Sequence, residues 1–174
     1  MSDRAEDTQQ IPPVSGNTKI QLVGSDAFRA ISATMAEGAT RQMEIFTYDL
    51  DPRIYDQQPF LEATKHLAIH TRGLAVKILL HDNDLVQRQG HRLIELARRM
   101  PSGIEIRKTH PDFVDHPETF LVVDRSRYVK ASLSARYHGV ADCLGKRQAR
   151  RLGEFFNLVW ECSENDSDLR HLHI

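Results

Sequence analysis

Short apolar runs alternate along this chain with longer segments in which apolar residues recur every three or four positions. The runs at Lys19–Val23, 43–48 and 75–80 have the length of strands, and the third is apolar almost throughout, as in a strand covered on both faces. Helical spacing is clearest near the end of the chain, in a wide apolar stripe of Leu152, Phe155, Phe156, Val159 and Trp160. Strands alternating with helices predict an α/β domain with a mixed, mostly parallel sheet and helices on both faces.

Capping and turn residues bound the remaining predicted elements. Ser25 stands where a helix N-cap belongs, Gly38 closes that helix, and Pro59 suits the first turn of the next one, which runs to about residue 71. The pattern further predicts a loop at 49–56, a helix at 85–100, and short strands at 104–107, 120–123 and 127–131. Polar segments at 1–17 and 164–174 predict tails on either side of one domain, residues 18–163.

The composition is that of an ordinary globular protein. Of the 174 residues 40% are hydrophobic and 27% charged, and a net charge of -1 leaves no overall basic excess for bulk nucleic-acid binding. No apolar run approaches the roughly 20 residues that a membrane-spanning helix needs. Cys143 and Cys162 form no metal-type pair, and no secretory leader is recognisable, so a cytoplasmic location is predicted.

Polar side chains follow several of the predicted strands. Tyr48 and His81 come directly after two apolar runs, and Asp124 and Ser132 stand at the ends of two later ones. In open α/β sheets ligands bind at the carboxyl ends of the strands. These four residues are therefore predicted to gather around one cleft.

The stretch from His116 to Ser134 resembles the signature half-site of the phospholipase D-like superfamily. That signature reads His, any residue, Lys, four residues, Asp, six residues, then Gly-Ser-any-Asn. With Asp124 in the Asp position, Ser132 and Ser134 fall in the Ser and Asn positions. Pro117 then occupies the His position and Thr119 the Lys position.

Three further segments are similar to the same superfamily and occur in the right order. They are the strand entry at 72–80, the second strand at 45–48, and the closing helix at 155–163. The likeness therefore covers roughly residues 19–163 and implies a phospholipase D-like layered fold. It also implies a single-motif bacterial member, and such members pair as two-fold homodimers that build one site across the interface.

The resemblance implies a catalytic mechanism, but this sequence lacks residues that the mechanism needs. In the superfamily one His attacks phosphorus, a second His protonates the leaving group, and Lys and Asn hold the phosphoryl oxygens. Pro117 carries no nucleophile and Thr119 no positive charge. The chain is therefore predicted to be a catalytically inactive binding or scaffolding module. The alternative is an active homodimeric phosphodiesterase or nuclease in which a one-residue bulge brings His116 into the His position and Glu118 into the Lys position.

The candidate site residues follow from these two readings. His116 and Asp124 are the candidate catalytic residues, although Asp124 could equally turn a tight connection. The candidate ligand-binding residues are Tyr48, His81, Lys130, Ser132 and Ser134. The two serines could instead satisfy the backbone of a turn. No metal or cofactor is predicted.

A local basic surplus qualifies the neutral overall charge. Lysine and arginine are concentrated in the last third of the chain, where they could bind a phosphate-bearing ligand or nucleic acid. Alternatively, they could simply form the solvent-exposed face of a helix. They are Arg125, Arg127, Lys130, Arg136, Lys146, Arg147, Arg150 and Arg151. A third possibility is an adaptor for a partner protein that takes no small ligand.

Overall fold

Eight strands form one sheet in the order β1-β7-β6-β5-β2-β3-β4-β8 in the computed structural model, which describes residues 18–165. The strands are β1 (Lys19–Val23), β2 (Met43–Thr47), β3 (Val76–Leu80), β4 (Ile104–Lys108), β5 (Glu118–Val123), β6 (Arg127–Ser132), β7 (His138–Asp142) and β8 (Glu164–Asn165). The helices are α1 (Ser25–Glu37), α2 (Pro52–Tyr55), α3 (Gln58–His70), α4 (Asp84–Gln89), α5 (Arg92–Arg99) and α6 (Lys146–Cys162). Two short 3-10 helices, η1 (Pro111–Phe113) and η2 (Leu133–Ala135), lie in the connections after β4 and β6.

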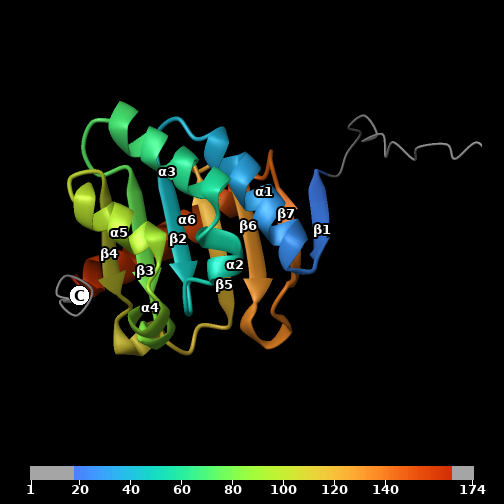
Figure 1. Cartoon of the computed structure of the whole chain (residues 1–174). Helices are drawn as coiled ribbons and strands as arrows, with labels where there is room; N and C mark the ends of the chain where they lie inside the picture. Colours follow the sequence, from blue (N-terminus) through green and yellow to red (C-terminus); the bar gives the residue numbers. More distant parts are fainter. Residues whose placement is uncertain (1–17, 166–174) are drawn as a thin grey trace, which may run out of the picture.

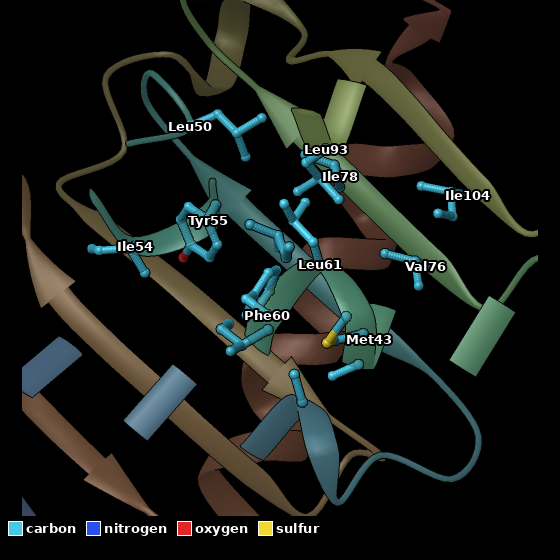
Figure 2. Close-up of a cluster of buried hydrophobic side chains, with 14 of the residues drawn as sticks. Met43, Leu50, Ile54, Tyr55, Phe60, Leu61, Val76, Ile78, Leu93 and Ile104 are labelled. Atoms are coloured by element: carbon cyan, nitrogen blue, oxygen red, sulfur yellow. The ribbon is translucent and has the colours of Figure 1, made fainter. Parts of the chain in front are cut away.

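The predicted α/β layering is confirmed, with helices on both faces of the sheet. Helices α1, α2, α3 and α5 lie on one face, and α6 crosses the other (Figure 1). The two faces hold separate apolar clusters, one around Ile45 and Phe60 and one around Phe46 and Phe156. Figure 2 shows the first of these clusters, where side chains from β2, β3, β4, α2, α3 and α5 converge.

The prediction that the sheet is mostly parallel is wrong. Only β2, β3 and β4 run parallel to one another, and every other neighbouring pair is antiparallel. The reason lies in the connections, because helices link β2, β3 and β4 whereas short turns link β5, β6 and β7. A short turn can join only antiparallel strands, while a parallel pair needs a longer crossover.

Four local predictions also differ from the structure. The predicted loop at 49–56 contains α2, which begins where the Asp51 carboxylate accepts a hydrogen bond from the Arg53 N–H at 2.9 Å. The predicted helix at 85–100 is two helices separated at Gly90, whose φ is 73°. Strand β7 was not predicted because its sequence, HGVAD, has no clear alternation. In the predicted C-terminal tail, β8 pairs with β4.

The apolar stripe of the last helix is confirmed as core. Leu152, Phe156, Val159 and Trp160 are buried against the sheet. Among residues 18–165, none of the helices combines the length and the apolar character that crossing a membrane requires. The predicted tail at 1–17, and residues 166–174 of the tail predicted at 164–174, lie outside the described residues.

Candidate functional site

A cavity of about 320 Å³ lies at the carboxyl end of β2, between the sheet and helices α1 and α2. Its walls are largely apolar and come from four elements. These are Phe28 of α1, Ile54 and Tyr55 of α2, Leu121 of β5 and Val129 of β6. The volume is within the range of small-molecule sites, so one small ligand would fill it.

The polar side of this cavity is a network of two carboxylates and one guanidinium. Arg136 donates to Asp49 and to Asp51, each at 2.9 Å, and the Tyr137 hydroxyl also donates to Asp51. Burial alone would raise the pKa of Asp51, but hydrogen bonds from Tyr137, the Arg53 N–H and Arg136 outweigh it and hold this pKa below its ordinary value. The Asp51 carboxylate is therefore charged at neutral pH.

The positions that resemble the catalytic signature lie beside this cavity. Thr119, in the Lys position, lines it, and so does Ser132. Pro117, in the His position, directly precedes β5, where its carbonyl accepts a hydrogen bond from the Leu133 N–H at 2.8 Å. The cavity wall thus carries a hydroxyl at the position where the superfamily carries a lysine.

His116 lies on the other face of the sheet, and Lys130, part of which lines the cavity, has its charged end near His116. The His116 ring stacks on Phe155 of α6, with ring centroids 4.3 Å apart, and its Nε2 atom is buried without a hydrogen-bond partner. Burial lowers the pKa of His116. The Lys130 ammonium donates to Glu118 at 2.6 Å.

Strand β5 contains no bulge that could shift this arrangement. Its six residues pair consecutively with β6, from Glu118 opposite Ser132 to Val123 opposite Arg127. Side chains alternate between the faces of a strand, so regular pairing sends Glu118 and Thr119 to opposite faces. The one-residue bulge considered for the alternative reading is therefore absent.

The predicted grouping of Asp124 with the other candidates is wrong. Because β5 runs antiparallel to β2, Asp124 lies at the opposite edge of the sheet, beside the residues that precede β2. Its carboxylate accepts hydrogen bonds from the N–H groups of Thr40, Arg41 and Gln42, at 2.8 to 3.0 Å, and from Arg127. Burial would raise the pKa of Asp124, but these donors outweigh it and lower the pKa. Asp124 thus anchors the loop between α1 and β2.

The remaining candidates lie near the cavity with different contacts. The Ser132 hydroxyl accepts a hydrogen bond from the Ser134 N–H at 3.3 Å and lies 2.8 Å from the Ser134 hydroxyl, so this pair caps η2. Tyr48 is exposed and lies between the cavity and a second hollow of about 350 Å³ that His81 lines. His81 is buried, with Nδ1 2.7 Å from the Thr47 carbonyl, and burial lowers its pKa.

In the network of Asp49, Asp51, Arg136 and Tyr137, Arg136 was among the basic residues predicted to receive a ligand, and Asp49 follows Tyr48 at a predicted strand end, whereas Asp51 and Tyr137 were not predicted as part of the site. One signal for Asp51 was present, since Asp51-Pro52 after a strand is a typical helix start. Reading 49–56 as a loop concealed it. Tyr137 gave no such signal, because only the turn after η2 brings it to α2. Within the part of the chain that the structure describes, no group of three or more His, Cys, Asp or Glu could hold a metal ion.

Comparison with known proteins places the chain in a family and identifies its fold. The model of a family described as a domain of unknown function, DUF7931, matches residues 24–172. No curated protein matches the chain significantly. Solved structures with the same fold include Nuc from Salmonella typhimurium, a phospholipase D family member, with a TM-score of 0.57 and 15% identity over 79% of this chain and 90% of that one.

Two further solved structures are similar. NucT from Helicobacter pylori has a TM-score of 0.55 and 11% identity, over 85% of this chain and 98% of that one. TrmBL2, an archaeal chromatin protein that binds DNA, has a TM-score of 0.60 and 18% identity, over 86% of this chain and 55% of its own. This chain thus spans about half the length of TrmBL2. The predicted phospholipase D-like fold is confirmed.

Proposed function

The chain belongs to the DUF7931 family of domains of unknown function, and we propose that it is a phospholipase D-like domain that binds a ligand without cleaving it. The observation that carries this proposal is the pairing of an intact cavity with the side chains beside it. Thr119 lines the cavity where a phosphoryl-binding lysine would be needed, and Pro117 stands where the nucleophile would be needed.

Phosphodiester cleavage of this type needs a nucleophile and fixed positive charge for the developing negative charge on phosphorus. Two cations line the cavity, Arg136 and Lys130. Asp49 and Asp51 already hold Arg136, and Glu118 holds Lys130. Neither cation is therefore free to receive the charge of a phosphodiester or of its transition state.

The geometry also argues against an active site built on His116. Its Nε2 atom is buried, its ring is packed on Phe155, and the face of the sheet that it occupies is the one that α6 covers. A nucleophile must be within about 3 to 3.5 Å of the atom that it attacks. His116 could approach a phosphorus atom only after leaving this packing.

The cavity itself favours an uncharged or cationic small molecule. Its apolar walls suit an aromatic or aliphatic body, and Asp49 and Asp51 suit a positively charged or hydrogen-donating group. The phosphate-bearing ligand expected from the sequence has no uncommitted cation here. A binding role is supported by TrmBL2, which shares the fold and binds DNA.

The purified chain is expected to show no phosphodiesterase activity. With bis(p-nitrophenyl) phosphate, release of p-nitrophenol should match the buffer rate, whereas enzymes accelerate their reactions by at least about 10⁶-fold. The measurement includes EDTA, which removes contaminating metal-dependent nucleases. Metal-independent turnover that His116→Ala abolishes would contradict the proposal and support the alternative reading.

Removing the Arg136 charge is expected to strengthen the binding of cations in the cavity. Arg136→Gln leaves Asp49 and Asp51 without their guanidinium, so benzylamine should bind about 3- to 10-fold tighter than to the unaltered chain, as followed by NMR titration. Arg136→Lys keeps the charge and serves as the matched control. Equal benzylamine affinity in all three proteins, or tighter binding of benzoate than of benzylamine, would contradict this assignment of the cavity.

The predicted homodimer and the predicted cytoplasmic location stay predictions. A two-fold dimer would bring a second copy to the edge of the sheet where the cavity opens. Light scattering on the purified chain measures its mass in solution and tests the dimer directly.

A further inference from the structure

A third hollow, of about 380 Å³, lies at the opposite edge of the sheet from the cavity. It is bounded by the connection into β2, the tight turn between β5 and β6, and the first turns of α6. Four cationic side chains line it, Arg41, Arg125, Lys146 and Arg150, together with the single carboxylate of Asp124. We call this hollow the basic pocket.

The acidic groups around the basic pocket are already engaged. The Asp124 carboxylate is shared by three backbone N–H groups, the Thr40 hydroxyl and Arg127. Glu44 receives two hydrogen bonds from Arg125, at 2.8 and 3.1 Å. Asp142, just before α6, accepts from the Thr18 hydroxyl and the Leu144 N–H.

Three cations of the basic pocket have no ion-pair partner among the described residues. Within residues 18–165, no carboxylate forms an ion pair with Arg41, Lys146 or Arg150, and all three are exposed. Like charges facing one hollow repel each other, so a bound anion would lower the electrostatic energy of the folded chain. Ser126 and Gln42 also line the pocket, and their side chains can donate hydrogen bonds to a bound anion.

The first turns of α6 add to this positive field. Four cations, Lys146, Arg147, Arg150 and Arg151, stand within six residues of its start, where the helix dipole is itself positive. The first turn contains no acidic residue, and no side chain caps it at Gly145. Negative charge is the ordinary stabiliser of a helix start, and here the protein supplies the opposite sign.

We infer that the basic pocket binds a phosphate group through Arg41, Lys146 and Arg150, with Arg125 held in place by Glu44. Oxyanions of this kind match both the spread of the cations and the donors between them. The inference does not depend on the proposed function, because it uses no residue of the cavity. Inorganic phosphate and the phosphodiester backbone of a nucleic acid share this chemistry.

The test removes two exposed charges and compares them with two removed elsewhere. Lys146→Ala/Arg150→Ala alters the basic pocket, whereas Lys65→Ala/Arg72→Ala removes the same charge from exposed positions at α3 and just after it. The probes are inorganic phosphate, measured by calorimetry, and a fluorescein-labelled single-stranded oligonucleotide of about 12 nucleotides, measured by anisotropy. Thermal unfolding of each variant checks that the fold is retained.

The pocket variant is expected to lose about tenfold or more in affinity for the probe that binds, and the control variant less than about twofold. If the oligonucleotide binds, the slope of log affinity against log salt should fall by about 1.4, since each single-strand phosphate contact contributes ~0.7. Tight oligonucleotide binding with weak phosphate binding would identify a nucleic-acid backbone as the source, and the reverse would identify a free phosphate. Failure of both probes, or equal losses in both variants, would overturn the inference.

Discussion

Replacing Asp124 with alanine is expected to lower the free energy of unfolding by about 2 to 4 kcal/mol, because the change leaves several partly buried donors without their acceptor at once. The carboxylate is buried and accepts hydrogen bonds from three consecutive N–H groups, those of Thr40, Arg41 and Gln42. It also pairs with Arg127, which in turn donates to the Gly38 carbonyl at 2.6 Å. The chain between α1 and β2 is thereby held against the β5–β6 turn.

The Asp124 contribution should depend on pH in a defined direction. Its pKa in the folded chain lies below the ordinary value of about 3.9, so the stabilisation is complete above that value and is lost as the pH falls through the folded pKa. Asp124→Asn is the matched variant, because asparagine tolerates the positive φ of 51° at this position. Chemical denaturation of both proteins between pH 7 and acid should show the difference between them shrinking as the pH falls. A difference that stays constant with pH would contradict the role of the charge.

Replacing Arg125 with alanine is expected to cost a similar amount, about 3 to 5 kcal/mol, because it leaves the Glu44 carboxylate buried and unpaired. Glu44 is 2% exposed and receives both of its charge-assisted hydrogen bonds from Arg125. Gly153 of α6 makes room for this guanidinium, since a Cβ at that position would lie 2.4 Å from the Arg125 Nε atom. The pair therefore joins β2, the β5–β6 turn and α6.

The contribution of Glu44 to stability depends on pH in the opposite direction to that of Asp124. Burial raises the pKa of Glu44 even with Arg125 present, so the carboxyl binds its proton more tightly in the folded chain than in the unfolded one. Its contribution to stability falls as the pH rises from the unfolded pKa, about 4.3, to the folded pKa. Arg125→Ala raises the folded pKa further, so this variant should recover stability on mild acidification. Denaturation at pH 5 and pH 8 measures the effect.

A double variant separates the pair from simple loss of packing. Glu44→Gln/Arg125→Ala removes the buried charge together with its partner, so it should be more stable than Arg125→Ala alone. If the double variant is no more stable than the single one, an unpaired carboxylate is not the cause of the loss.

Much of the fold could be predicted from local pattern. The helix that begins at Ser25 and the stripe from Leu152 to Trp160 each bury one face at a regular helical period that can be read from the sequence. The strand at 75–80 could be predicted from its continuous apolar run, which is covered on both faces. The mostly parallel sheet was predicted wrongly, because strand direction depends on how long each connection is and where it leads. Strand β7 has no period of its own and forms only between β1 and β6.

The candidate site also combines features that the sequence determines with features that only the tertiary structure decides. The sequence by itself determined that Pro117 and Thr119 stand at the positions where the resemblance requires a nucleophile and a cation. Only the tertiary structure decided which side chains share a space. It placed Asp124 at the far edge from Ser132, because β5 and β6 pair antiparallel and their carboxyl ends therefore lie at opposite edges of the sheet. It also brought Arg136 onto Asp49 and Asp51 across more than eighty residues of chain. Chemical identity is local to a residue, whereas its neighbours are fixed by the path of the whole chain.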